Sequence, residues 1–360
     1  MKNIVIHPWE EHEDRDGLFI PDYIEALAHE VLKNYDLRVK SFKAIATKPE
    51  KGGAIWKIET NLGPKSLKLL HRRPSRSLFS LGAQKYLVED KHARVPKIFK
   101  TKNGKDFIEA GGKLWFVADW IEPLNPVSKD LEGTKKLCYA LGEFHRLTQG
   151  YVPPKEAEIA SRLHKWPKKY EKIITRMDWF RHIAKAYKEM PASTHILSMV
   201  DKYQEQARKS LIRLNNSDYF ELIKKGNESW GLAHQDYGWS NGQMGPGGMW
   251  IIDLDGVAYD LPIRDLRKLI SGKMLELSKW DVTWVREMIK AYHKANSITP
   301  ELYEILMIDL SLPNEFYTSM NEVLYQPELL LKDSALIKPV IDIENSKWKT
   351  LKEIQSDWRK

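Results

Sequence analysis

The stretch HQDYGWSNGQMGPGGMWIIDLD, which begins at His234, brings together several side chains that could carry chemistry. Asp236 lies two residues after His234, Asn241 follows five residues later, and Asp253 and Asp255 end an apolar run. Phosphoryl transfer needs a carboxylate that accepts the proton of the attacking hydroxyl, and Mg²⁺ held by Asp and Asn oxygens. The pattern therefore predicts Asp236 as the general base, Asn241 as a metal ligand, and Asp253 as the carboxylate that links metal and phosphates.

The residues between these side chains predict how they are positioned. GQMGPGG has the composition of a hairpin turn, and MWII, directly before Asp253, is typical of a short buried strand. The spacing D-x-x-x-x-N is weak evidence by itself. The ordered set H-x-D-x-x-x-x-N, then a hairpin, then I-D-x-D is considerably more specific.

The same stretch is also compatible with a second chemistry, that of a metal-dependent hydrolase that uses the H-x-D of His234 and Asp236. Such sites need further histidines at strand ends. The other ten histidines of the chain are isolated, and none forms H-x-H or H-x-x-x-H with another. The hydrolase is therefore a remote alternative.

Composition limits the class of protein. A chain of 360 residues is long enough for two domains or one bilobal unit, and the lone Cys138 excludes an internal disulfide framework. No apolar run approaches the roughly 18 residues of a membrane span, so we expect synthesis in the cytosol. The net charge is +8, but the basic runs 71–76 and 165–176 belong to no recognisable nucleic-acid module. We therefore expect no nucleic-acid partner.

Periodicity divides the chain into a strand-rich part and a helix-rich part. Before Trp120 the sequence predicts two helices and five strands: helices at 21–35 and 77–90, strands at 41–47, 54–60, 66–71, 95–101 and 113–120. After Trp120 it predicts mainly helices, beginning with 131–150 and a long helical region over roughly 160–225. This order is the α+β pattern of a small antiparallel lobe followed by a larger helical lobe.

The catalytic motif resembles that of the aminoglycoside-phosphotransferase and choline-kinase branch of the protein-kinase-like fold. That family has a loop of the type H-G-D-x-x-x-x-N followed by an I-D-x-x carboxylate, and here Gln235 replaces the glycine. The resemblance implies ATP and Mg²⁺ as cofactors, with the three roles given above. His234 and Asp255 would support the loop. Asp265 would brace it from the start of a helix, although Asp265 also suits a plain helix N-cap.

The same resemblance places the nucleotide pocket in the first half of the chain. Lys68, between Leu67 and Leu69, matches the strand lysine that holds the α- and β-phosphates. Gly52 and Gly53 match the turn over the phosphates. The segment that would present backbone groups to adenine contains three residues: Asp119, Trp120 and Ile121.

One expected partner is missing from the sequence. Kinases of this fold pair the strand lysine with a glutamate on the following helix, but the matching position here is Ala83, with Gln84 beside it. No acidic residue occurs between Lys68 and Glu89. We therefore expect that ion pair to be absent, and Lys68 either to have another partner or to support only slow turnover.

A narrower resemblance, over about residues 25–330, is to the spore coat protein S family of endospore-forming bacteria. It is carried by IWKIET-x-x-GP-x-x-LK, HRRP-x-x-x-LF, TQGYVPP, SRLHKWPKKY, HQDY-x-x-x-N and IDLDGVAYDLPIRDLRK. The resemblance implies synthesis in the mother-cell cytoplasm and assembly into the spore coat, with other coat proteins as partners. Residues 151–180, basic and Trp-rich, lie where relatives bind their acceptor.

These observations predict a bilobal kinase-like protein. Its parts would be an N-terminal arm, an N-lobe, a hinge and a C-lobe with an acceptor-side helical insert: 1–20, 21–118, 119–123, 124–360 and about 150–230. Two functions stay open. One is transfer of the ATP γ-phosphate to a hydroxyl of an unidentified small molecule or coat component. The other is a pseudokinase that acts as a coat scaffold, for which the tail 347–360 could pack back on the lobe or contact partners.

Overall fold

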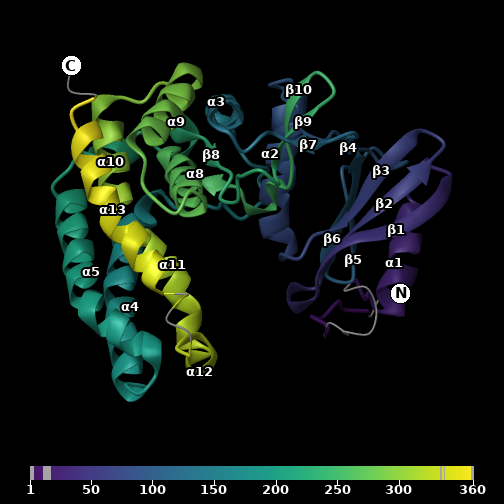
Figure 1. Cartoon of the computed structure of the whole chain (residues 1–360). Coiled ribbons are helices and arrows are strands. Elements are labelled where there is room, and N and C mark those ends of the chain that lie inside the picture. The colour runs from purple at the N-terminus through teal and green to yellow at the C-terminus, as the bar shows by residue number, and fades with distance from the viewer. Residues whose placement is uncertain (1–3, 11–17, 333–334, 336, 358–360) are drawn as a thin grey trace. The chain divides into compact units, whose positions relative to one another are not determined.

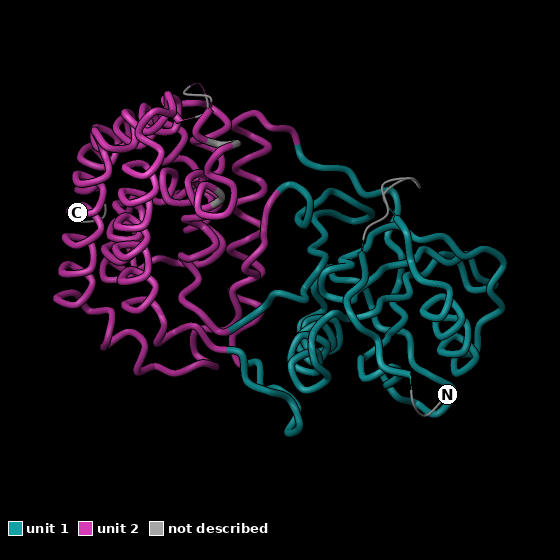
Figure 2. The backbone as a smooth tube through the Cα atoms, turned by 90° about the horizontal axis from the view of Figure 1, so that it is seen from below, with its two compact units in different colours: residues 1–127, 151–160, 239–258 teal, residues 128–150, 161–238, 259–360 magenta. Residues whose placement is uncertain are grey.

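The computed structural model describes residues 4–10, 18–332, 335 and 337–357. The chain forms two compact units, coloured separately in Figure 2. Unit 1 comprises residues 1–127, 151–160 and 239–258, and unit 2 comprises residues 128–150, 161–238 and 259–360. The predicted arm, 1–20, and the predicted tail, 347–360, lie partly outside the described residues.

Unit 1 is built on an antiparallel sheet with the strand order β1-β2-β3-β6-β4, and β5 also pairs with β6 (Figure 1). Its main elements are α1 (Asp22–Leu32), β1 (Val39–Lys48), β2 (Gly53–Thr60), β3 (Gly63–Leu69), α2 (Pro74–Glu89), β4 (Ile98–Phe99), β5 (Ile108–Ala110) and β6 (Lys113–Asp119). The predicted helices and strands of this half are thereby confirmed. The strand predicted at 95–101 is shorter than expected, because Pro96 has no N–H for a ladder.

The two faces of this sheet bury different residues. Alternate side chains of a strand point to opposite faces, so Trp115 and Val117 of β6 join Trp56 in the cluster under α1. Phe116 and Ala118 belong to a second cluster, which includes Leu78 and Leu81 of α2. The indole rings of Trp56 and Trp115 stack with their centroids 5.7 Å apart. One face of the sheet is therefore closed by α1, whereas the other is shared between α2 and polar residues.

A hairpin from the second half of the chain completes unit 1. β9 (Gly242–Gly245) and β10 (Gly248–Ile251) pair antiparallel across the predicted GQMGPGG turn, and β9 also pairs with β7 (Asn125–Pro126). The backbone N–H of Ile251 donates to the carbonyl of Arg94 at 3.0 Å. These contacts bring Asn241 and Asp253 into the same unit as Lys68.

Unit 2 is mostly helical, as predicted. Its elements are α3 (Leu131–Thr148), α4 (Trp166–Ala186), α5 (Pro191–Asn215), α6 (Tyr219–Ile223), α7 (Asn227–Trp230), β8 (Leu232–Ala233), β11 (Ala258–Tyr259), α8 (Ile263–Glu276), α9 (Val282–Ala295), α10 (Pro300–Ser311), α11 (Asn314–Met320), α12 (Pro327–Leu330) and α13 (Lys338–Ile354). Short 3-10 turns, η2 (Leu163–Lys165) and η4 (Asn321–Leu324), precede α4 and follow α11. None of the described helices combines the length and the apolar character that crossing a bilayer would require.

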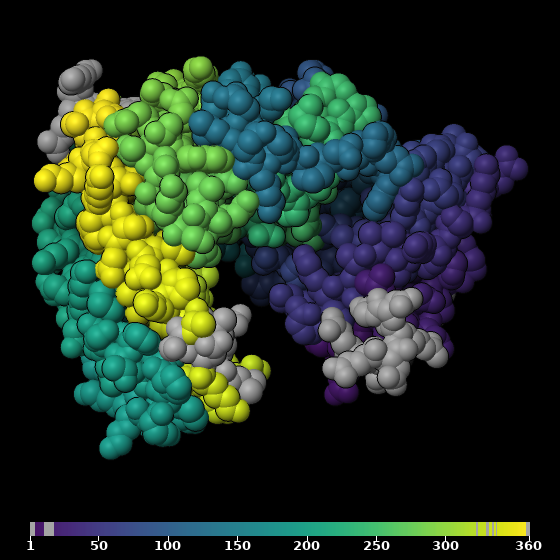
Figure 3. All heavy atoms as spheres, in the orientation of Figure 1, coloured from purple at the N-terminus to yellow at the C-terminus, as the bar shows by residue number. Residues whose placement is uncertain are grey.

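The tail of the chain packs onto unit 2. Figure 3 shows α13, in yellow, against the teal helix α5, and the hydroxyl of Tyr203 donates to the carbonyl of Ile341 at 3.3 Å. Lys347 of α13 is fully buried and lies within 2.6 Å of Glu315 and 2.5 Å of Glu344. The tail up to Ile354 is therefore part of the helical core.

Candidate active site

Lys68 owes its position to the register of the sheet. It pairs with Ile55 on β2 and Phe116 on β6, so its side chain projects from the face that carries Phe116, whereas Leu67 and Leu69 point toward the α1 core. The residue is therefore a charged side chain between two apolar ones, Leu67 and Leu69, on a strand that is paired on both sides.

Two carboxylates hold the Lys68 ammonium. Its Nζ lies 2.6 Å from Oδ1 of Asp253 and 2.7 Å from Oδ1 of Asp255. Burial alone would lower the pKa of Lys68, but the negative charges of Asp255 and Asp253 outweigh burial and raise it. Asp253 has a positive φ of 58° and begins the short turn η3 (Leu254–Gly256), in which Asp255 lies. The turn thus presents both carboxylates to one lysine.

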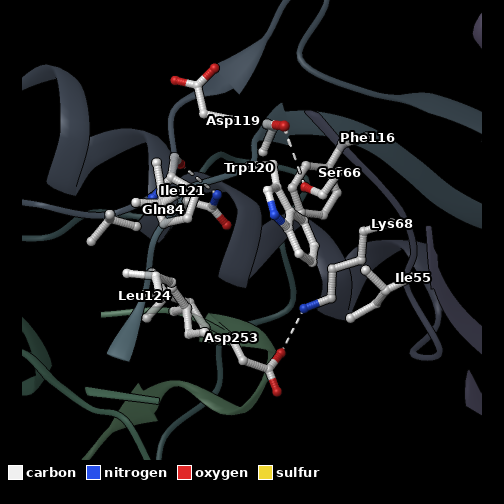
Figure 4. Close-up of a pocket in the computed structure, with 15 residues that line it drawn as sticks. Ile55, Ser66, Lys68, Gln84, Phe116, Asp119, Trp120, Ile121, Leu124 and Asp253 are labelled. Atoms are coloured by element: carbon white, nitrogen blue, oxygen red, sulfur yellow. Dashed lines mark hydrogen bonds and ion pairs between the residues drawn. The ribbon is translucent and has the colours of Figure 1, made fainter. Parts of the chain in front are cut away.

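A pocket of about 160 Å³ opens beside this ion-paired group (Figure 4). It lies wholly within unit 1 and is lined by Ile55, Ser66, Lys68, Gln84, Val95, Pro96, Phe116, Ala118, Asp119, Trp120, Ile121, Leu124, Ile252, Asp253 and Leu254. Its walls are mostly apolar, and the charged pair of Lys68 and Asp253 stands at one end, where Figure 4 shows the ion pair. This arrangement suits a flat apolar ring with an anionic group attached.

The predicted adenine segment lines this pocket. The backbone N–H of Asp119 donates to the carbonyl of Lys97 at 2.9 Å, and that of Trp120 to Pro64 at 3.4 Å. Within the described residues the N–H of Ile121 makes no such bond, so it is available to a ligand in the pocket. The structure brings Asp119, Trp120 and Ile121 together with Lys68 and Asp253 around one cavity.

Helix α2 supplies an amide where a carboxylate was expected. Gln84 lines the pocket, and its Nε2 donates to the carbonyl of Pro96 at 2.7 Å. Ala83 is fully buried. Asp255 is therefore the partner of Lys68 that was not found on the helix. The sequence pattern predicted Asp255 only as a supporting residue, because in kinases of this fold the partner of the lysine lies on the helix that corresponds to α2 rather than on the turn after β10.

A different local feature favours glycine at each of the two predicted phosphate-loop positions. Gly52 has a φ of +65°, which favours glycine, and Gly53 lies so close to His71 that a Cβ would come within 2.8 Å of that side chain. Gly53 adjoins Lys68 and Asp255 in a small neighbouring recess, whereas Gly52 lines neither cavity. Burial lowers the pKa of His71 to about 4, so this ring is neutral at physiological pH.

Asn241 and Asp253 are the candidate metal ligands. The carbonyl of Asn241 accepts from the N–H of Ile252 at 3.0 Å. Asp253 directly follows Ile252, so Asn241 and Asp253 lie near each other at the open end of the β9–β10 hairpin. An amide oxygen and a carboxylate are the hard donors that Mg²⁺ takes when it keeps several waters. The donor chemistry therefore fits magnesium.

The first part of the catalytic loop, residues 234–238, belongs to unit 2 and is held by Asp265. Its carboxylate accepts from the backbone N–H groups of His234 at 2.5 Å and Gln235 at 3.1 Å. It also contacts Nε2 of His145 at 3.2 Å, and Nδ1 of His145 contacts the hydroxyl of Tyr292 at 2.8 Å. Burial alone would raise the pKa of Asp265, but the hydrogen bond and charge of His145 outweigh it and lower the pKa.

Asp265 is thus a brace for the loop rather than a helix cap. Helix α8 begins at Ile263, two residues earlier, and Pro262 occupies the N-cap. Gln235 has a positive φ of 73°, so the chain turns between the backbone amides that Asp265 accepts from and the following residue, Asp236. Asp236 itself is exposed, while His234 is fully buried.

Sequence reasoning missed Asp260, which ties two parts of unit 2 together. One carboxylate oxygen accepts from the indole N–H of Trp166 at 2.7 Å, and the other from Nε2 of Gln235 at 3.2 Å. Burial raises the pKa of Asp260 to about 6. In the sequence, the only indication of this role is that an acidic residue stands between apolar ones, in YDLP.

The alternative hydrolase has no ligand set in the part of the chain that the structure describes. No group of three or more His, Cys, Asp or Glu side chains there could hold a metal ion. His234 contacts the rings of Phe144 and Tyr237, so its surroundings are those of a buried structural histidine.

Solved structures with a similar fold are phosphotransferases. An aminoglycoside phosphotransferase from Alicyclobacillus acidocaldarius matches with a TM-score of 0.74 at 15% identity, over 97% of this chain and 98% of that one. An amicoumacin kinase in complex with AMP-PNP and Ca²⁺ matches with a TM-score of 0.56 at 15% identity, over 93% and 96%. At these identities the likeness shows the fold, which is the bilobal protein-kinase-like α+β fold.

Sequence comparison identifies the family. No family model matches the chain. Spore coat protein S of Bacillus subtilis (strain 168) is 30% identical over 300 residues, which cover 83% of this chain and 84% of that protein. With this identity and coverage, and with the kinase-like fold described above, the chain belongs to the spore coat protein S family.

Proposed function

We propose that this protein is an ATP-dependent phosphotransferase of the spore coat that transfers the γ-phosphate to a hydroxyl group. The observation that carries the proposal is the buried ion pair of Lys68 with Asp253 and Asp255 at the end of an apolar pocket. The pocket would hold the adenine, with the free N–H of Ile121 as a donor. Lys68 would hold the α- and β-phosphates.

The remaining residues have complementary roles in this proposal. Asn241 and Asp253 would hold Mg²⁺, which supplies charge neutralisation of the polyphosphate when bound. Asp236, exposed on the braced loop, would accept the hydroxyl proton as the acceptor oxygen bonds to the γ-phosphorus and the bond to the ADP oxygen breaks. Asp265 positions that loop through the amides of His234 and Gln235.

The lobes and the location in the spore are part of the same proposal. Residues 119–123 would be the hinge between an N-lobe, 21–118, and a C-lobe with its acceptor-side insert. Synthesis in the mother-cell cytoplasm and assembly into the coat, beside other coat proteins, are supported by the similarity to spore coat protein S.

A second function, a nucleotide-binding scaffold without turnover, is favoured by one observation. Gln84 occupies the place of the expected helix glutamate and is engaged with Pro96 instead. The lysine is nevertheless held by Asp255, which is why we favour the enzyme.

Two measurements on the purified protein separate these functions. Calorimetric titration with ADP, with and without Mg²⁺, should show binding that Lys68→Met weakens. Labelled ATP and a spore-extract metabolite pool should give a phosphorylated product that Asp236→Asn abolishes, while Asp218→Asn, an exposed acid of the same unit, leaves the product unchanged. Binding without any Asp236-dependent product would assign the scaffold. Absence of nucleotide binding would exclude both.

A further inference from the structure

Five cationic side chains gather in unit 2 at the starts of two helices. We name them the cation cluster: Arg162, Lys169, Arg264, Arg267 and Lys268. The first lies just before α4, the second in its first turns, and the other three in the first turns of α8. Cations at a helix N-terminus oppose the helix dipole, so this concentration needs an explanation other than helix stability.

Lys169 lies on α4 among residues that hydrogen-bond two buried carboxylates. Trp166, one turn earlier, donates to Asp260 at 2.7 Å, and Tyr170 donates to Asp309 at 3.0 Å. Lys169 interacts electrostatically with both acids, but makes no hydrogen bond or ion pair to any described residue. Burial lowers its pKa to about 8, so the ammonium is still largely charged at neutral pH.

The buried acids leave some cations of the cluster without a hydrogen bond. Asp309 is fully buried and is engaged by Nε of Arg267 at 2.9 Å, with Nη1 of Arg264 at 3.8 Å. That Nη1 has no hydrogen-bond partner within the described chain. Asp260 is satisfied by Trp166 and the catalytic loop rather than by a cation. Two partly exposed cations, Lys169 and Arg264, are therefore left without a hydrogen-bonded anion.

The cluster adjoins the catalytic loop of the same unit. The ammonium of Lys268 donates to the carbonyl of Gln235, the residue before Asp236. Lys268 also interacts electrostatically with Asp236 and Arg162. The backbone N–H of Arg162 donates to the carbonyl of Tyr259 at 2.8 Å, beside Asp260. Lys268, one member of the cluster, thus lies next to the proposed base.

We propose that the acceptor is an anionic hydroxyl compound, a small polyol carrying a carboxylate or phosphate, whose anionic group binds Lys169, Arg162 and Arg264. The assignment rests on the proposed phosphotransferase function, whose acceptor class it names. One anionic group of the acceptor could accept a charge-assisted hydrogen bond from each of these cations, which Asp309 does not do for Lys169 or Arg264. Polycationic acceptors such as aminoglycosides would be repelled by the same side chains.

The test uses two matched pairs of probes: glycerol 3-phosphate with glycerol, and gluconate with sorbitol. Binding to the full chain is measured by calorimetry at pH 7 in the presence of Mg²⁺ and ADP. We expect at least one anionic member to bind and its neutral counterpart not to bind. Lys169→Met should weaken that binding about 10- to 100-fold, whereas Lys169→Arg should largely restore it. Lys168→Met, an exposed neighbour, is the matched control.

Arg162→Ala keeps the test decisive if Lys169→Met unfolds, because the Arg162 side chain is exposed. Equal binding of neutral and anionic probes, failure of both anions to bind, or equal effects of Lys168→Met and Lys169→Met would overturn the proposal. Transfer of labelled phosphate is measured separately. Anion binding without transfer would reject the kinase activity and keep the anion subsite. Transfer to neutral polyols alone would keep the kinase activity and reject the anion subsite.

Discussion

Replacing Asp255 by Asn tests whether this carboxylate positions Lys68 in place of a helix glutamate. Both side chains of the pair are about nine-tenths buried, at 12% and 11% exposure, so solvent screens it little. Removing one partner of a buried pair typically costs about 3–5 kcal/mol. Because Lys68 keeps Asp253 at 2.6 Å, we expect about 2 kcal/mol, which in a unit of this size lowers the thermal midpoint by about 4–8 °C.

The functional consequence follows from the shared carboxylate. Asp253 is ion-paired with Lys68 and is also a proposed Mg²⁺ ligand. Asp255 is therefore the carboxylate that can remain ion-paired with Lys68 when Mg²⁺ and nucleotide bind. Asp255→Asn should therefore weaken Mg²⁺–ADP binding about tenfold, measured by calorimetry, which corresponds to about 1.4 kcal/mol.

Asp106→Asn provides the matched control for this experiment. It removes a carboxylate 2.8 Å from Lys85 in the same unit, but that lysine is 38% exposed, so the expected loss is at most about 0.5 kcal/mol. A double-mutant cycle of Asp255→Asn with Lys68→Met should show coupling of about 1–2 kcal/mol. Equal effects of the two Asp variants, or coupling near zero, would refute a positioning role for Asp255.

Two further substitutions address the loop brace and the pocket wall. Asp265→Asn should destabilise the protein by about 3 kcal/mol, because it weakens the acceptor of two buried amides, and urea unfolding measures this loss. The pKa of Asp265 in the folded protein is lowered from 3.8, so its contribution to the free energy of unfolding is complete above about pH 4 and falls as the pH drops further. The difference in unfolding free energy between wild type and variant should therefore shrink on acidification. A difference that grows would contradict this reasoning. Gln84→Glu should cost about 2–3 kcal/mol, because a carboxylate would face the Pro96 carbonyl. Unchanged stability with tighter Mg²⁺–ADP binding would instead mean that the glutamate pairs with Lys68.

The sequence predicted the elements better than the contacts between them. Alternation placed Lys68 between Leu67 and Leu69 on a strand, and the hairpin composition placed Asn241 and Asp253 on either side of β9 and β10. Those features depend on local periodicity and turn chemistry, which a single sequence displays. Pro96 accounts for the late start of β4, but its end depends on pairing with β6, which stops at Phe99 and which sequence does not display.

The partners of buried charges could not be predicted in the same way. Asp255 reaches Lys68 because Asp253 adopts a positive φ and starts a 3-10 turn, a conformation set by tertiary contacts. Asp260 reads as an ordinary acid near a loop, yet it joins Trp166 to Gln235 across about 70 residues of chain. Side-chain hydrogen bonds between distant segments leave no periodic signal.

The energetics of the Lys68 group favour a ligand-binding role over a purely structural one. Holding one ammonium and two carboxylates away from water is costly, and replacing buried ion pairs with apolar residues is often neutral or stabilising. A scaffold would gain nothing from these three charges beside an open apolar pocket. A nucleotide would gain a cation for its phosphates and a carboxylate for its metal. The same reasoning applies to Lys169 and Arg264 in unit 2, whose ammonium and Nη1 groups have no hydrogen-bonded anion among the described residues.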